Sequence, residues 1–236
     1  MVASGDSYPI VLTGIFWQRQ GALVIGGGAV AERKIKNLLA TVAQVRVIAP
    51  TLTSALQAMA AAGEFEWLAR EWQPGDVWAC PQSLLVFAAT NITLVNQAVS
   101  DEARAAGRLL NRADDPADCD FILPGVVRAG EITVTVTTSS LPLEHEGDST
   151  GEAGVSPALT AYLRQKIAQT IGPEYSELAV MLRLLRPYVK AHVAPLQRAT
   201  LWLQMVNSPA LALLQAGRRD EAQALLHTMV QQSLAA

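Results

Sequence analysis

The feature that most constrains this chain is an apolar strand that runs directly into a glycine turn and a helix. Residues 22–25 form the strand pattern, Gly26, Gly28 and Ala31 make a G-x-G-x-x-A turn, and residues 32–40 have helical spacing. Gly26 permits a tight turn, Gly28 has no Cβ to keep a ligand from the backbone, and Ala31 allows close helix–strand packing. The pattern therefore predicts a phosphate-binding turn at a helix N-terminus.

A second strand strengthens this prediction. Residues 44–49 follow the predicted helix and complete a strand–helix–strand unit. In this context the glycine pattern is typical of a dinucleotide-binding domain. A glycine turn with a purely structural role in an α/β core is the alternative.

The residues that usually select the cofactor are missing. A NAD site commonly has Asp or Glu about 20 residues after the glycines, but this chain has Pro50 and Thr51 after its second strand. Arg46 lies inside that strand and is a poor candidate for binding a 2′-phosphate. We expect Thr51 or backbone groups to hold the adenosine ribose, and these residues leave NAD and NADP as alternatives.

Strands and helices alternate through the first half of the chain. Further strands are predicted at 64–68, 83–89 and 108–111, and further helices at 53–62 and 92–106. This alternation predicts an α/β fold with a Rossmann-type, doubly wound parallel sheet, whose ligands bind at the carboxyl ends of the strands. The residues expected at such ends are Gly26, Pro50, Thr90 and Asn111.

The pattern changes after residue 112. Residues 122–124 and 131–138 have β character, and the second stretch alternates Ile or Val with Thr. Residues 141–154 are acidic and glycine-rich, which is typical of a loop. Ser156-Pro157 is a typical helix start, and the rest of the chain has helical patterns.

We therefore predict three domains. The dinucleotide-binding domain covers residues 1–112, a small β dimerisation region with the acidic loop covers 113–154, and a helical domain covers 155–236. Breaks between the C-terminal helices are expected at Gly172-Pro173, Pro195, Pro209 and Gly217.

The composition excludes several classes of protein. A net charge of −3 gives no general positive field for nucleic acid or an anionic membrane. The 2 cysteines form neither a disulfide framework nor a zinc ligand set, so no metal site is predicted. The N-terminus has no secretory pattern, and no apolar run reaches about 18 residues. These features predict a cytoplasmic protein.

Short motifs along residues 8–170 carry a family resemblance. They are Tyr8-Pro9-Ile10, the run from Gly26 to Lys34, Val47-Ile48-Ala49-Pro50, Ala88-Ala89-Thr90, Asn111-x-x-Asp114, the run from Asp120 to Pro124, and Ser156-Pro157. In this order they resemble the precorrin-2 dehydrogenase and sirohydrochlorin ferrochelatase family, the N-terminal module of siroheme synthases. No methyltransferase part follows in this sequence, which is similar to the stand-alone form of that family.

The resemblance implies a function. In that family a homodimer oxidises precorrin-2 to sirohydrochlorin with NAD, and some members also insert ferrous iron. The family motifs assign the glycine turn to the pyrophosphate, the end of the second strand to the adenosine, and the residue after the strand at 83–89 to the nicotinamide. The residues so implied are Gly26, Gly28, Ala29 and Val30 at the pyrophosphate, Pro50 and Thr51 at the adenosine, and Thr90 near the nicotinamide.

The resemblance assigns the key carboxylate to Asp114. Oxidation of the macrocycle releases a proton that a carboxylate can accept, and iron insertion must also remove pyrrole protons. A turn in which Asp114 bonds only to the backbone is the alternative. Asp115 and Asp118 are nearby candidates for the same role.

The tetrapyrrole substrate is a polycarboxylate, so cations are expected at its site. The resemblance implies Asn111, Arg112 and Thr138 as substrate-binding residues, and Arg128 and Arg164 are further candidates for binding carboxylates. Lys34 is interpreted as an exposed residue of the first helix, outside the site.

The chain departs from the family pattern after the threonine-rich strand. The family has a glycine pair and a short step there, whereas this chain has the acidic insert at 141–154. His145 and the acids beside it are interpreted as a surface loop rather than a metal site. A non-catalytic dinucleotide-sensing module, with a helical tail that binds a partner, is the alternative function.

Overall fold

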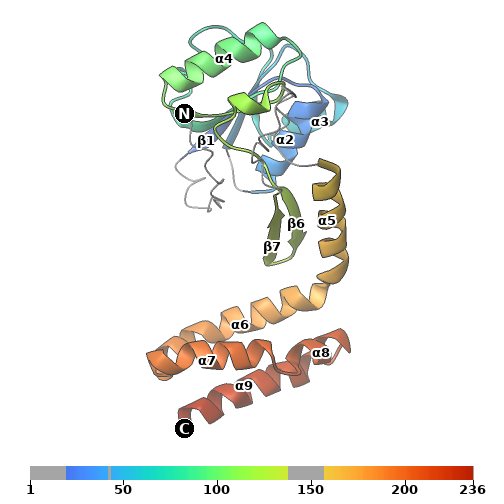
Figure 1. Cartoon of the computed structure of the whole chain (residues 1–236), viewed down its shortest axis with the longest axis vertical. Coiled ribbons are helices and arrows are strands. Elements are labelled where there is room, and N and C mark those ends of the chain that lie inside the picture. Colours follow the sequence, from blue (N-terminus) through green and yellow to red (C-terminus); the bar gives the residue numbers. More distant parts are fainter. Residues whose placement is uncertain (1–19, 42–43, 138–156, 236) are drawn as a thin grey trace, which may run out of the picture. The chain divides into compact units, whose positions relative to one another are not determined.

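The computed structural model describes residues 20–41, 44–137 and 157–235 (Figure 1). By internal contacts the chain divides into two compact units. The sheet unit ends at Leu123, and the helical unit comprises the described residues from Pro124 onward. Each unit is described by itself.

The sheet unit is built on a parallel sheet of 5 strands in the order β3-β2-β1-β4-β5. The strand order reverses between β1 and β4, which creates a switch point at the carboxyl end of β1. This confirms the predicted doubly wound parallel sheet. The strands are β1 (Gly21–Ile25), β2 (Gln44–Ile48), β3 (Glu66–Leu68), β4 (Ser83–Ala88) and β5 (Leu109–Arg112).

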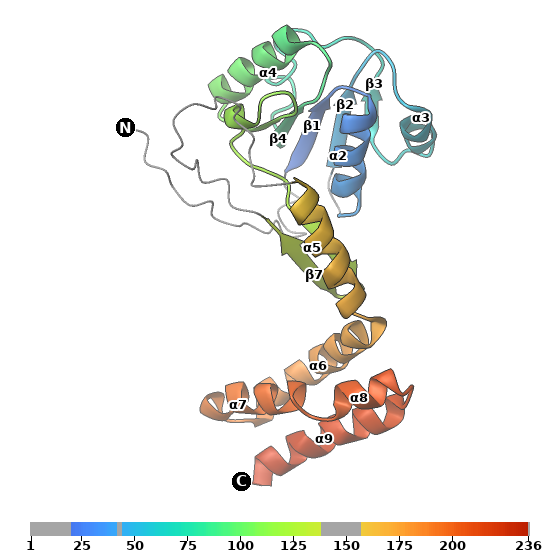
Figure 2. The same ribbon diagram turned by 45° about the vertical axis from the view of Figure 1, so that its right-hand side comes forward.

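Helices cover both faces of this sheet. Figure 2 shows α2 (Ala29–Leu39) and α3 (Ser54–Ala61) on one side of the sheet and α4 (Thr93–Ala105) on the other. Phe87 is fully buried on the α2 side, and its neighbour Val86 is fully buried on the α4 side. Because both faces are covered, β4 is an uninterrupted apolar run, and each such side chain contributes about 2 kcal/mol.

The helical unit begins with an antiparallel hairpin. The strands β6 (Gly125–Ala129) and β7 (Ile132–Val136) pair with each other, and α5 (Pro157–Thr170) packs against β6. The expectation of β structure at residues 122–124 was wrong. Ile122 and Leu123 are exposed, and Pro124 has no N–H for a strand ladder, so β6 begins one residue later.

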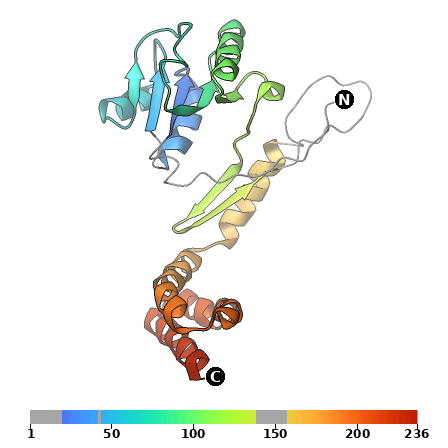
Figure 3. The same ribbon diagram turned by 90° about the vertical axis from the view of Figure 1, so that its left-hand side faces the viewer.

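The remaining helices share an apolar core, and Figure 3 shows their ribbons gathered into one bundle. They are α6 (Pro173–His192), α7 (Pro195–Val206), α8 (Ala210–Gln215) and α9 (Arg219–Ala235). The expected breaks are confirmed, because α6 and α7 each start at a proline, α8 follows Pro209, and Gly217 has a positive φ before α9. In the described parts of the chain, no helix is long and apolar enough to cross a membrane.

Candidate active site

The turns after β1, β4 and β5 are joined into one edge of the sheet. The N–H of Ala89 donates to the carbonyl of Ile25 at 2.8 Å, and the N–H of Ala113 donates to the carbonyl of Ala88 at 2.9 Å. The glycine turn, Thr90 and Asp114 follow directly on these bonded ends. Residues that lie far apart in the sequence therefore meet at the carboxyl edge, where ligands of such sheets bind.

The three glycines of the turn have different roles. Gly26 has a φ of +126°, and a Cβ there would lie 2.3 Å from the carbonyl oxygen of Ala89. A Cβ on Gly27 would lie 2.1 Å from the carbonyl oxygen of Thr51. A Cβ on Gly28 would meet nothing within 4 Å. The first two glycines are required by the fold, and Gly28 leaves an open approach to the backbone.

The N-terminus of α2 is free of a side-chain cap. Gly28 is the N-cap residue, and Ala29 and Val30 after it are exposed. The first N–H groups of a helix have no partner within the helix, so they are available to a bound anion. The nearby Glu32 is neutralised by Lys36 and accepts a hydrogen bond from Thr53 Oγ1 at 2.6 Å. This open, uncapped turn fits the pyrophosphate of a dinucleotide.

The end of β2 presents Pro50 and Thr51, which are both exposed. Arg46 is directed elsewhere, since its Nε donates to Glu66 at 2.7 Å. Arg70, which follows β3, grips Asp76 with two hydrogen bonds of 2.7 Å. Both arginines that the sequence places around this strand end are thus engaged by protein carboxylates.

Asn96 connects the turns after β4 and β5. It is fully buried on α4, and its Oδ1 accepts from the hydroxyl of Thr90 at 2.7 Å while its Nδ2 donates to the Thr90 carbonyl at 3.1 Å. Asn96 also helps to lower the pKa of the Asp114 carboxyl group. Asn96 was not predicted from the sequence. The available signal was its helical spacing with Val99 and Ala103, which puts an amide on the buried face.

Asp114 lies directly after β5 and keeps 27% of its side chain exposed. Arg112 Nε donates to its Oδ1 at 2.9 Å. Burial raises the pKa of Asp114, but the hydrogen bonds from Arg112 and Asn96 outweigh burial and hold this pKa below its ordinary value. The group is therefore ionised at neutral pH, in the form that can accept a proton.

Asn111 and Arg112, which the family motif places at the substrate, are both buried. Asn111 accepts from Lys34 Nζ and donates to the carbonyl of Phe121 at 2.8 Å. Arg112 donates to Gln97 at 2.6 Å as well as to Asp114. Their polar groups are engaged within the protein, and contact with substrate stays a prediction. Thr138, the third such residue, lies outside the described residues.

The expectation that Lys34 is exposed was wrong. Lys34 is half-buried, and its Nζ bonds to Asn111 and lies 5.7 Å from the centre of the Phe87 ring. Burial lowers the pKa of Lys34. The cause is the direction of α2, which points this side chain toward the β4–β5 face rather than to solvent. Sequence spacing alone did not give that direction.

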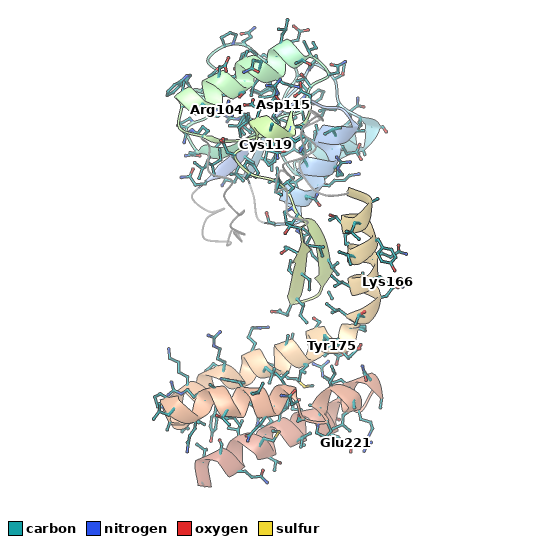
Figure 4. All side chains as sticks on the ribbon, viewed as in Figure 1. Arg104, Asp115, Cys119, Lys166, Tyr175 and Glu221 are labelled. Carbon is teal, nitrogen blue, oxygen red and sulfur yellow. The ribbon has the colours of Figure 1, made fainter. Side chains whose placement is uncertain are left out.

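The loop that carries Asp114 is tightly held. It contains the short 3₁₀ helix η1 (Pro116–Asp118), which Asp115 caps by accepting from the N–H of Ala117 at 3.2 Å. Cys119 Sγ accepts from the N–H of Arg112 at 3.1 Å. Figure 4 shows the labelled Arg104, Asp115 and Cys119 in this part of the unit. Asp115 caps η1 and Asp118 is bound to Ser100 at 2.7 Å, so both of these carboxylates serve the structure of the loop itself.

Two arginines of the helical unit share a groove. Arg128 on β6 and Arg164 on α5 line a cavity of about 720 Å³ together with Val126 and Tyr162. Among the described residues, no group of three or more His, Cys, Asp or Glu side chains could hold a metal ion. His145 and the acids of the insert lie outside the described residues.

The fold and the turn define the class of protein, a dinucleotide-binding α/β domain followed by a helical unit. Residues 15–125 match the family model described as putative NAD(P)-binding. Residues 174–230 match the model of the sirohaem synthase dimerisation region. The second match covers most of α6–α9 and not the β6–β7 hairpin, to which our domain prediction assigned dimerisation. The predicted boundaries at 112 and 154 stay a prediction.

Known relatives narrow the class to a family. The chain is 32% identical to siroheme synthase 1 of Yersinia enterocolitica over 207 residues, which are 87% of this chain and 40% of the relative. It is 34% identical to the siroheme synthase of Pseudomonas entomophila over 219 residues, or 92% of this chain and 44% of that protein. The chain thus spans about two fifths of the length of the curated relatives it matches.

A solved structure shares the fold. The protein described as SirC, precorrin-2 dehydrogenase, superposes with a TM-score of 0.67 at 20% identity and covers 94% of this chain and 100% of its own. The two family models and the siroheme synthase relatives support the family of siroheme synthase modules that the motifs resemble.

Proposed function

We propose that this chain oxidises precorrin-2 to sirohydrochlorin with NAD as its cofactor. The observation that carries the proposal is an ionised Asp114 on the same sheet edge as an uncapped, open glycine turn. The family resemblance supports the choice of substrate. The siroheme synthase relatives and the precorrin-2 dehydrogenase that shares the fold agree with this choice.

We assign the cofactor to the edge formed by the turns after β1, β2 and β4. Gly26, Gly28, Ala29 and Val30 would receive the pyrophosphate, because the helix end offers N–H groups without a competing cap. Pro50 and Thr51 would flank the adenosine, and Thr90 would lie near the nicotinamide. When bound, the nicotinamide supplies the acceptor for a hydride.

We favour NAD over NADP. An additional 2′-phosphate is usually bound by a basic side chain near the end of the second strand. Arg46 within β2 and Arg70 after β3 are engaged by the carboxylates of Glu66 and Asp76. For either arginine to bind a 2′-phosphate, its ion pair would have to break.

We assign the proton step to Asp114. Loss of a hydride from the macrocycle is accompanied by loss of a proton, and an ionised carboxylate at the open edge can take it. The same base would take pyrrole protons if the chain also inserts ferrous iron, with iron as a substrate. The proposal of iron insertion rests on the family resemblance.

Arg128 and Arg164, which line one groove of the helical unit, are candidates for binding carboxylates. Guanidinium groups bind carboxylates through paired hydrogen bonds.

We further propose that the protein acts as a homodimer. The match of residues 174–230 to a dimerisation region supports this assembly.

The test is the conversion of precorrin-2 by the purified chain, followed by absorption with NAD, with NADP, and with or without ferrous iron. Asp114→Ala should lower the rate of oxidation by about 100-fold or more, the usual contribution of a general base. Its affinity for NAD should stay within about twofold of wild type, because the glycine turn is untouched.

Asp220→Ala, which removes an exposed carboxylate at the start of α9, is the matched control and should leave the rate unchanged. Full activity of Asp114→Ala would remove Asp114 from the mechanism. If wild-type protein binds NAD but does not convert precorrin-2, the dinucleotide-sensing module becomes the better description.

A further inference from the structure

A buried arginine stands two residues before the carboxylate that we assign to the proton step. The side chain of Arg112 at the end of β5 is only 4% exposed. Burying a guanidinium is costly unless anionic and polar partners surround it. The hydrogen-bond partners of Arg112 therefore indicate which side chains it holds in place.

Arg112 grips the carboxylate of Asp114 with two prongs. Nε donates to Oδ1 at 2.9 Å and Nη2 donates to Oδ2 at 3.4 Å. A planar guanidinium that contacts both oxygens fixes the orientation of the carboxylate as well as its position. An ammonium group at the same place would attract the charge but would not fix the plane.

The other edge of the guanidinium is braced. Arg112 Nη1 donates to Asp118 Oδ2 at 3.0 Å and to Gln97 Oε1 at 2.6 Å. Asp118 is in turn fixed to α4, since it accepts from the hydroxyl of Ser100 at 2.7 Å and pairs with Arg104 at 2.6 Å. Arg112 is therefore held by side chains that lie on α4 or are bonded to it. Its Nε and Nη2 groups face Asp114.

We propose that Arg112 is a positioning residue that holds the carboxylate of Asp114 in one reactive orientation, with Asp118 and Gln97 as its brace. This inference rests on the proposed function, in which Asp114 accepts the proton of the substrate. It replaces the expected role of Arg112 as a substrate contact. Arg112 acts through Asp114 and does not touch the macrocycle.

A merely structural ion pair would have different consequences. Loss of such a pair lowers stability but leaves the pH dependence and the plateau rate of the folded enzyme unchanged. A positioning role changes both, because Arg112 also lowers the pKa of Asp114. The other charged or titratable groups around this loop are Lys34, Arg104, Asp115, Asp118, Cys119 and Asp120, and all are retained in the variants of Arg112.

The experiment compares Arg112→Gln and Arg112→Lys with wild type in the oxidation of precorrin-2 across pH. In Arg112→Gln the acid limb of kcat should move to higher pH, because Asp114 loses the group that lowers its pKa. The plateau kcat should fall about 10- to 100-fold, the size expected for a misplaced base. Arg112→Lys should bring the acid limb back toward wild type without restoring the plateau, while KM and NAD affinity stay within about twofold.

Arg70→Gln is the matched control, because it breaks another two-pronged Arg–Asp pair of the same unit. It should lower stability without moving the acid limb or the plateau. The inference is overturned if Arg112→Gln behaves like this control. It is also overturned if KM rises while kcat is unchanged, which would make Arg112 a substrate contact.

Failure of the proposed function is seen separately, as wild-type protein that does not oxidise precorrin-2. In that case, NMR titration of ¹³C-labelled Asp114 tests the pair without activity. A higher pKa of Asp114 in Arg112→Gln than in wild type or Arg70→Gln supports the pairing, and an unmoved pKa overturns it.

Should Arg112→Gln not fold, Asp118→Asn removes charge from the brace and should lower the plateau kcat in the same direction by about threefold to tenfold. An unchanged plateau there also overturns the inference.

Discussion

The two units of this chain bury different kinds of side chain. Within the described residues, every buried polar or charged side chain lies in the sheet unit, whereas the buried side chains of the helical unit are apolar. The buried polar residues are Asp76, Ser83, Asn96, Ser100, Asn111 and Arg112. The helical unit instead has a core of Leu, Met, Val and Ala.

The difference indicates that the core of the helical unit serves stability, whereas the buried polar groups of the sheet unit serve chemistry. Burying a polar group costs free energy unless its hydrogen bonds are replaced, so an arrangement of four such residues on α4 and β5 needs a reason. These four, Asn96, Ser100, Asn111 and Arg112, converge on the loop of Asp114. Among the described residues of the helical unit no buried polar side chain is found, and its core is apolar.

The largest effect is expected from a cavity in the helical unit. Met205 is fully buried in its core, so Met205→Ala should lower the free energy of unfolding of this unit by about 3 kcal/mol. The affinity for NAD should not change, because the dinucleotide edge belongs to the sheet unit. Thermal unfolding followed at Trp202, together with NAD titration, measures both quantities.

The control for Met205 lies on the same helix. Leu203 is 64% exposed, so Leu203→Ala should change the free energy of unfolding by no more than about 0.5 kcal/mol. Weaker NAD binding by Met205→Ala would contradict the separation of the two units.

At Gly28 we expect a smaller effect, which changes the affinity for NAD and leaves stability unchanged. Gly28→Ala adds a methyl group that meets no protein atom and has no unfavourable backbone angle, so stability should stay within about 0.5 kcal/mol. The methyl group stands where the pyrophosphate is expected, so NAD should bind about tenfold more weakly, or about 1.4 kcal/mol. Isothermal titration and thermal unfolding distinguish the two effects.

Asn37→Ala provides the comparison, since Asn37 is exposed farther along α2. It should alter neither stability nor affinity. If Gly28→Ala binds NAD as tightly as Asn37→Ala, the pyrophosphate does not lie over this turn.

The sequence predicted the parts of the molecule that depend on local pattern. The β1 strand, the glycine turn and the parallel sheet follow from apolar runs and glycine spacing, and the helix breaks follow from Pro and Gly. The start of β6 was mispredicted, because the apolar Ile122 and Leu123 precede a proline that cannot enter a ladder.

The network around Asp114 could not be predicted in the same way. Asn96 and Arg112 look like ordinary polar residues of a helix and a strand end, and Lys34 looks like a surface residue. Their burial depends on which helix face meets which strand, and this is decided by tertiary packing. Motif spacing located Asp114, but not the partners that hold it.

The smallest effect should be seen when the pH is lowered. The pKa of Asp76 is lowered by its hydrogen bonds with Arg70, and Ser100, Arg104 and Arg112 together lower that of Asp118 against the opposing effect of burial. A carboxyl group with a lower pKa in the folded than in the unfolded state stabilises the fold above its unfolded pKa. This stabilisation is lost as the pH falls through the folded pKa.

The sheet unit should therefore lose stability below about pH 4, near the unfolded pKa of Asp. Between pH 6 and pH 4 the loss should stay under about 1 kcal/mol for each carboxylate. In the helical unit, Arg218 lowers the pKa of Glu221, but these side chains are 56% and 57% exposed, so solvent screens the pair. The helical unit should accordingly resist acid better than the sheet unit.

Fluorotryptophan NMR can separate the two units during an acid titration. Trp67 donates to the carbonyl of Ala49 in the sheet unit, and Trp202 packs on the core of the helical unit. The resonance of Trp67 should reach its unfolded position at a higher pH than that of Trp202. In Asp76→Asn the midpoint of Trp67 should move to higher pH and the gap should widen, because the amide lacks the ionised form that stabilises the fold above the unfolded pKa. Coincident midpoints in wild type would show that the buried ion pairs do not set the acid stability of the sheet unit.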